Sequence, residues 1–265
     1  MRCGHDISIE FDINDAVTHQ AVELFQPDLI IAPFLKRVIP ETIWRKHTCF
    51  IVHPGIIGDR GPSALDWAIM HDRQEWGVTV LQANAEMDAG DIWASEIFPM
   101  RFTSKSSLYR HEVVTAATNA VLTAIAHFQS TFTPIPLDYS CSAVLGRLHA
   151  PIRQFDRSIN WQQNKTNTIL RKIHAADGFP GVLDTLHGES YFLFDACREE
   201  CLTGKPGTVI AKRNNAICRA TVDSAIWIGH LKHKNNTEPT FKLAATIALK
   251  NHLADVPEIP FDPFS

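Results

Sequence analysis

Residues 51–61 read IVHPGIIGDRG, and this stretch decides the fold of the first half of the chain. The apolar run Cys49–Val52 leads directly into His53, and Pro54-Gly55 then forms a turn. A β-branched, continuous apolar run that stops at such a turn is typical of a buried strand that opens onto a loop. We therefore predict that His53 ends a strand and stands at an edge of a sheet.

A second polar position follows the same logic. The run Trp76–Gln82 is also strand-like, and Asp88 comes soon after it in Met87-Asp88-Ala89-Gly90-Asp91. If both strands run parallel, their carboxyl ends meet at one sheet edge, where open α/β sheets bind ligands. Imidazole and carboxylate together form a general acid/base pair. His53 and Asp88 are therefore the candidate catalytic residues, with Asp91 as a structural turn residue.

The first half of the chain alternates between strand and helix patterns. This alternation predicts an α/β fold with a parallel sheet and helices on both faces. The segment Leu29–Ala32 is apolar enough to be buried on both faces. We expect strands at 7–11, 29–32, 49–52, 76–82 and 91–99, and helices at 15–25 (N-cap Asp15), 40–44, 63–70 and 106–128.

The second half has a different pattern. Prolines among small polar residues mark a linker over 131–157, which separates a domain at 1–130 from one at 158–250. A helix at 166–176 precedes four short strand-like runs that are separated by turns. Such spacing predicts a small antiparallel β-barrel. Residues 251–265 are proline-rich and are expected to be a connector.

Composition excludes several classes of protein. The chain has 265 residues, 45% hydrophobic and 20% charged, with a formal net charge of -4, which argues against a nucleic-acid partner. We also expect no membrane span, because no apolar run approaches about 20 residues. The six cysteines form no zinc-type pair and the thirteen histidines form no ligand pair, so no metal is assigned and a cytoplasmic location is expected.

The motifs then indicate a family. The pattern Ile-Val-His-Pro-Gly, followed by Arg60-Gly61, Trp67-Ala68-Ile69 and Met87–Asp91, resembles the signature of folate-dependent formyltransferases. Residues 178–181, Gly-Phe-Pro-Gly, resemble the start of that family's C-terminal OB-like antiparallel β-barrel domain. Over nearly the whole chain, the runs at 58–67, 84–93 and 226–232 are similar to the formyltransferase-like part of HypX-type hydrogenase maturation proteins.

This resemblance implies a Rossmann-like catalytic domain and a donor, 10-formyltetrahydrofolate, with coenzyme A as a carrier of the one-carbon unit. It implies a role in supplying the carbon monoxide ligand of nickel-iron hydrogenase, together with an enoyl-CoA-hydratase-like domain and the hydrogenase maturation machinery. His53 and Asp88 would handle protons. Arg60, Lys36 and Arg37 are candidate contacts to folate or coenzyme A, although Arg60 equally suits bonds to nearby carbonyl groups.

Two departures from the family pattern leave alternatives open. Position 51 is Ile where tRNA and nucleotide formyltransferases carry an Asn that donates to the formyl oxygen, an interaction often worth ~3 kcal/mol. The family's first βα unit also has no counterpart, so we expect a fragment, truncated at both ends, that is poorly soluble alone and binds folate weakly or not at all. The alternative function is a non-catalytic folate- or coenzyme-A-binding or scaffold protein. A divergent tRNA formyltransferase is a third possibility, which Ile51 and the acidic balance weaken.

Overall fold

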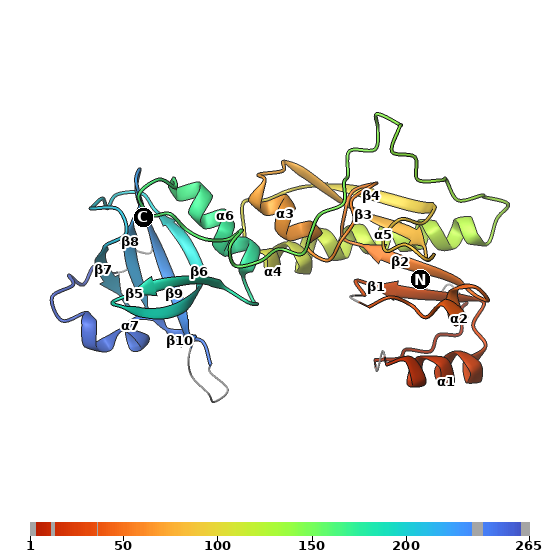
Figure 1. The fold of residues 1–265 in the computed structure, drawn as a ribbon, viewed down its shortest axis with the longest axis horizontal. Helices are drawn as coiled ribbons and strands as arrows, with labels where there is room; N and C mark the ends of the chain where they lie inside the picture. Colours follow the sequence, from red (N-terminus) through yellow and green to blue (C-terminus); the bar gives the residue numbers. More distant parts are fainter. Residues whose placement is uncertain (1–3, 12–13, 36, 235–240, 261–265) are drawn as a thin grey trace. The chain divides into compact units, whose positions relative to one another are not determined.

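The structure is a computed structural model that describes residues 4–11, 14–35, 37–234 and 241–260 (Figure 1). The chain divides into two compact units. The first unit is built from residues 1–62, 76–98 and 113–149, and the second from 63–75, 99–112 and 150–265.

A four-stranded sheet is the centre of the first unit. Its order is β1 (Leu29–Pro33), β2 (Thr48–His53), β3 (Glu75–Gln82) and β4 (Ile92–Pro99). Strands β1 and β2 are parallel, as predicted, whereas β3 runs antiparallel to β2, so the sheet is mixed. The expectation that β2 and β3 run parallel was therefore wrong. A parallel connection needs a crossover packed on the sheet, but the helix between these strands, α3 (Ala64–Met70), belongs to the second unit and packs on α6 (Thr166–Ala176).

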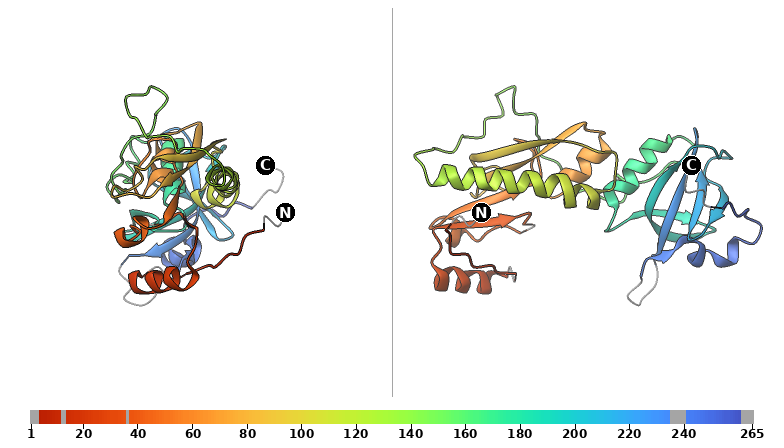
Figure 2. Two further views of the ribbon diagram at one scale, coloured as in Figure 1. Left: turned by 90° about the vertical axis from the view of Figure 1, so that its right-hand side faces the viewer. Right: turned by 180° about the vertical axis from the view of Figure 1, so that it is seen from behind.

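Three helices accompany this sheet. Helix α5 (Val114–Phe128) runs along one face of the sheet (Figure 2), where Phe128 contacts the rings of Phe50 and Trp93. The short helix α2 (Glu41–Trp44) adds Ile43 to a second apolar cluster. Helix α1 (Asp15–Phe25) contributes Val22 to the same cluster. The observed N-cap of α1 is Asn14, one residue before the predicted Asp15, because its side chain accepts a hydrogen bond from the backbone N–H of Val17.

Three predicted elements differ from the structure. Residues 7–11 form no strand, because no strand in the described part of the chain pairs with them, and Ile7 and Phe11 are 77% and 89% exposed. Strand β1 is only partly buried, since it is the end strand of the sheet. The predicted helix at 106–128 is divided by a π-helical turn, Tyr109–Val113, between α4 (Lys105–Leu108) and α5. An apolar pattern alone therefore did not determine where these elements pair or break.

The second unit contains a six-stranded sheet, and every strand pairing described for it is antiparallel, as predicted. Helix α6 packs Ile169 and Ile173 onto this sheet, where they join Leu193 and Ile228 in one apolar core. The strands are β5 (Val182–Leu186), β6 (Glu189–Glu199), β7 (Val209–Arg213), β8 (Ala216–Ala220), β9 (Ala225–His233) and β10 (Leu243–Ala244), followed by α7 (Ala245–Ala248) and the 3-10 turn Lys250–His252.

The segment from 131 to 149 belongs to the first unit and is hydrogen-bonded to its other parts. Ile135 exchanges two backbone hydrogen bonds with Ile92, and the N–H of His149 donates to the carbonyl of Arg60. This segment therefore packs beside the loop that follows β2. The domain boundaries expected at 130 and 158 stay a prediction. Among the residues that the structure places, no helix has both the length and the apolar character that a membrane crossing requires.

Candidate functional site

His53 is the last residue of β2 and is only 4% exposed. Its Nε2 lies 2.8 Å from Oδ2 of Asp59, whose side chain is completely buried. Two hydrogen bonds from β3 fix the turn after His53: Trp76 Nε1 donates to the carbonyl of Pro54, and Thr79 Oγ1 donates to the carbonyl of Gly55. The turn and the buried strand together hold the imidazole in one place.

Asp88 lies against the other side of the imidazole. Its Oδ2 is 3.5 Å from Nδ1 of His53 and accepts a hydrogen bond from the backbone N–H of Gly61 at 3.2 Å. The prediction that His53 and Asp88 lie close together is confirmed, but the two residues do not stand at the ends of two parallel strands. Strand β3 ends with Gln82 opposite Phe50, so the loop from 83 to 91 must fold back toward the end of β2. Asp88 accordingly has a left-handed backbone conformation, with φ of 53°.

Arg60 anchors the loop that carries Asp88. Its Nε donates to the carbonyl of Met87 at 3.1 Å, and its Nη2 lies 2.7 Å from Oε1 of Glu86. The side chain of Arg60 is only 14% exposed. Of the two alternatives for Arg60, the contacts agree with bonds to nearby carbonyl groups, since its partner Met87 lies in the loop between β3 and β4.

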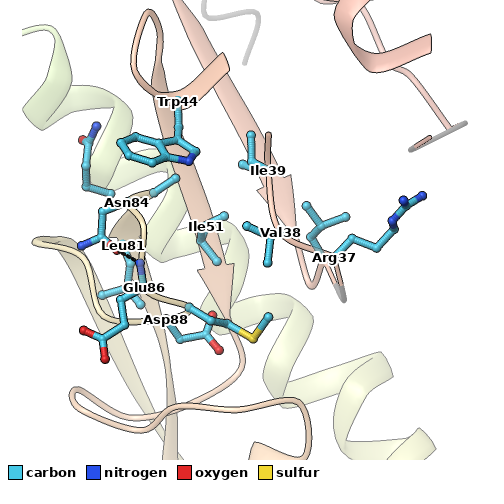
Figure 3. Close-up of a pocket in the computed structure, with 13 residues that line it drawn as sticks. Arg37, Val38, Ile39, Trp44, Ile51, Leu81, Asn84, Glu86 and Asp88 are labelled. Atoms are coloured by element: carbon cyan, nitrogen blue, oxygen red, sulfur yellow. Dashed lines mark hydrogen bonds between the residues drawn. The ribbon is translucent and has the colours of Figure 1, made fainter. Parts of the chain in front are cut away.

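The two other predicted binding residues have different outcomes. Lys36 lies outside the residues that the structure describes. Arg37 has an exposed side chain whose Nη2 is 3.6 Å from Oδ1 of Asp15. In Figure 3 the guanidinium of Arg37 points away from Asp88. The structure therefore does not bring Arg37 to the His53–Asp88 pair.

Glycines allow the close approach of the loops around the pair. A Cβ at Gly55 would lie 2.5 Å from Nε2 of His53 and 2.6 Å from Oδ2 of Asp59. A Cβ at Gly146 would lie 1.9 Å from the backbone N of Asp59, and one at Gly90 would lie 1.7 Å from the carbonyl O of Gln82. Three separate loops thus pack without side chains where they meet the site.

Asp59 is the residue that the sequence analysis did not select. Burial raises the pKa of its carboxyl above the ordinary value, although the hydrogen bond and positive charge of His53 act in the opposite direction. Its Oδ1 is buried without a hydrogen-bond partner among the described residues. The signal that could have found it is its place in IVHPGIIGDRG, six residues after His53 across a Pro-Gly turn.

A narrow cavity adjoins Asp88 but not His53 or Asp59 (Figure 3). Trp44, Ile51 and Leu81 supply apolar walls, and Asn84 and Glu86 supply polar groups beside Asp88. The cavity encloses about 30 Å³. Asp88 is therefore the member of the pair that a molecule bound in this cavity could reach.

Comparisons with known proteins agree with this geometry. The formyl transferase family matches residues 12–125, and the formyl transferase C-terminal domain matches residues 151–242. Hydrogenase maturation factor HoxX of Bradyrhizobium diazoefficiens is 48% identical over 258 residues, which cover 97% of this chain and 45% of that protein.

Solved structures of HypX and of a formyltransferase are also similar to this chain. HypX from Aquifex aeolicus in complex with tetrahydrofolic acid is 43% identical, with a TM-score of 0.90, over 98% of this chain and 45% of that one. Methionyl-tRNA formyltransferase from Clostridium thermocellum, at 17% identity and a TM-score of 0.57 over 71% of this chain and 80% of that one, shares the fold alone.

The chain spans about half the length of the hydrogenase maturation relatives it matches. Both formyl transferase regions, and the likeness to HoxX and HypX across nearly all of the chain, agree with one another. The chain belongs to the formyl transferase family, in the group formed with the HypX-type hydrogenase maturation proteins.

Proposed function

We propose that this chain binds 10-formyltetrahydrofolate beside Asp88 and processes its formyl group in the maturation of nickel-iron hydrogenase. The observation that carries the proposal is the contact between buried His53 and partly buried Asp88, which lines a cavity, in a fold shared with HypX bound to tetrahydrofolic acid. A carboxyl group backed by an imidazole can deliver the proton that the folate nitrogen needs when the formyl carbon leaves it.

The lining of the cavity suits the flat, partly polar ring system of a folate. Trp44, Ile51 and Leu81 offer apolar surface, while Asn84 and Asp88 offer polar atoms on one side. Ligand sites typically combine such walls with a few polar groups.

The proposed acceptor is a thiol, with coenzyme A as the carrier, and not an amine. Ile51 lines the cavity, and its hydrocarbon side chain cannot donate a hydrogen bond to a formyl oxygen that gains negative charge. A purified chain should therefore leave methionyl-tRNA unformylated, as measured by acid-gel separation of aminoacyl-tRNA. Detectable formyl-methionyl-tRNA would show that another group supplies the missing donor.

The wider setting is part of the same proposal. The five cysteines in the described ranges are free thiols, which suits a reducing cytoplasm. An enoyl-CoA-hydratase-like domain and the hydrogenase maturation machinery are the proposed partners. Arg37, on the rim of the cavity, is the proposed contact for the folate glutamate or for coenzyme A phosphates, and Lys36 joins it in this proposal.

The release of tetrahydrofolate from 10-formyltetrahydrofolate tests the function directly. Absorbance spectroscopy follows the release with and without coenzyme A, and His53→Ala should slow it by ~100-fold or more. His19→Ala is the matched control, because His19 is an exposed histidine of α1 that does not line the cavity. A wild-type rate in His53→Ala would remove the basis of the assignment.

A further inference from the structure

The site contains a second carboxylate, Asp59, that the proposed function does not yet use. It is more deeply buried than Asp88: the side chain of Asp59 is 0% exposed, and that of Asp88 is 11% exposed. The contact from Asp59 to Nε2 of His53 is also shorter, at 2.8 Å against 3.5 Å for the contact from Asp88 to Nδ1. Both nitrogens of the imidazole therefore face a carboxylate.

This arrangement leaves neither ring nitrogen open to a bound molecule. Of the three groups, only Asp88 lines the cavity. The loops from 54 to 61 and from 144 to 149 enclose Asp59, since a Cβ at Gly55 or at Gly146 would overlap it. A proton can thus pass between His53 and a bound molecule only by way of Asp88 within this part of the structure.

We propose that Asp59 is a positioning residue that fixes the tautomer of His53, so that Nδ1 exchanges a proton with Asp88 and Asp88 meets the one-carbon donor. Once Asp59 has ionised, its carboxylate only accepts hydrogen bonds, so Nε2 of His53 keeps its hydrogen on Asp59. A carboxylate that orients a catalytic histidine in this way is known from serine proteases. The proposal rests on the proposed function for its reaction but not for its geometry.

The proton balance follows from these contacts. The sulfur of the thiol acceptor forms a bond to the formyl carbon, and the bond from that carbon to N10 of the folate breaks. The thiol gives its proton to Asp88, which exchanges protons with Nδ1 of His53, and the carboxyl of Asp88 gives one proton to N10. His53 keeps its Nε2 hydrogen on Asp59 throughout, so the three groups end as they began.

Two other features support a functional reason for Asp59. Its Oδ1 has no hydrogen-bond partner among the residues described, and an unpaired buried oxygen is costly for the fold. His149 and Asp88 are the other charged or titratable groups that act on this carboxyl besides His53. Such an uncompensated polar atom is typical of sites retained for function and not for stability.

The test combines nitrogen NMR of His53 with steady-state kinetics on the whole chain. In ¹⁵N-histidine-labelled protein, the signals of His53 are those lost in His53→Gln. At every pH above that at which Asp59 ionises, we expect Nε2 to carry hydrogen, and Nδ1 to be the nitrogen whose signal moves with pH. Asp59→Leu, similar in size, should shift the ring toward the Nδ1–H tautomer. Asp88→Asn, the matched control, should leave the Nε2 hydrogen in place.

Steady-state kinetics of tetrahydrofolate release are the second measurement. Asp59→Leu should lower kcat for tetrahydrofolate release by on the order of 100-fold, with KM for the folate unchanged, because Asp59 does not line the cavity. Should Asp59→Leu not fold, Asp59→Asn decides, since its amide can donate to Nε2 and reverse the tautomer. An unprotonated Nε2 in the wild type, or an unchanged ring and kcat in both variants, would overturn the proposal. A tautomer shift in a chain without any tetrahydrofolate release would contradict the proposed function and leave the role of Asp59 standing.

Discussion

Gly55→Ala should separate His53 from Asp59 by inserting one methyl group between them. The new Cβ would lie 2.5 Å from Nε2 of His53 and 2.6 Å from Oδ2 of Asp59. Because carbon contacts are ordinarily about 3.5–4.0 Å, the imidazole or the carboxylate must move by about 1 Å. The backbone of Gly55 needs no left-handed conformation, so the effect arises from the side chains alone.

The displacement predicts losses of both rate and stability. A misplacement of about 1 Å at a reacting group can cost ~100-fold in kcat. Overpacking of a buried site typically costs ~1–3 kcal/mol in the free energy of unfolding. At this chain length each kcal/mol lowers Tm by roughly 2–4 °C. We expect Gly55→Ala to show both effects, measured as tetrahydrofolate release and as thermal melting by circular dichroism.

A control separates the two effects. Val113→Ala removes two methyl groups from a position that is 0% exposed in the first unit. It should cost ~1.6 kcal/mol at about 0.8 kcal/mol for each buried carbon, without moving His53. If Gly55→Ala keeps the wild-type rate, or if Val113→Ala loses as much activity for the same loss of stability, the geometric argument is wrong.

Three further predictions concern other parts of the first unit. Arg60→Met should free the carbonyl of Met87 and lower kcat about 10-fold by loosening the Asp88 loop. Glu86→Gln removes only the exposed partner of Arg60 and leaves its bond to Met87, so it should lower kcat less; an equal loss of kcat in both variants would refute the anchoring role. Burial raises the pKa of Asp59, so the unfolded chain releases this proton at a lower pH than the folded chain does. The carboxyl therefore lowers stability as pH rises from about 4, until the folded chain has also released its proton. Urea unfolding should show Asp59→Asn gaining stability over wild type across this interval and no further gain above it, and a pH-independent difference would contradict the shift. Exposed apolar residues and unpaired strand edges promote self-association, and the first unit has both, in Ile9, which is 70% exposed, and in β1, the end strand of its sheet. Ile9→Lys should therefore reduce self-association of the chain, as measured by light scattering. Unchanged scattering would exclude the segment around Ile9 as a cause of self-association.

The sequence predicted those features that local chemistry determines. The run before His53 forms β2 because continuous β-branched residues favour a buried strand, and Pro54-Gly55 ends it. The antiparallel sheet of the second unit was predictable because turn residues separate its short strands at regular intervals. His53 and Asp88 were found because each follows a strand-like run and each has side-chain chemistry suited to proton transfer.

The features that the sequence did not predict depend on long-range pairing. The direction of β3 depends on where the chain lies after α3, which no local pattern records. Residues 7–11 alternate like a strand but have no partner strand in the structure. Asp59 looked like one polar residue in a glycine-rich loop, and its contact with Nε2 of His53 appears only when the loop closes over the ring. Pairing, and not propensity, decided each of these cases.

The end of β2 also gives the physical reason for proposing a thiol, and not an amine, as the acceptor. Residues two apart in a strand share a face, so Ile51 and His53 project to the same side of the sheet. An amide at position 51 would stand beside the imidazole and stabilise a negative oxygen, but Ile51 offers only hydrocarbon to the cavity. The chain instead places its polar groups behind the histidine, where Asp59 holds Nε2 and Arg60 anchors the loop of Asp88. A site built in this way controls the location of a proton more than the charge on the formyl oxygen. Such control suits transfer to a thiol that ionises readily, for which delivery of a proton to the departing folate nitrogen is the demanding step.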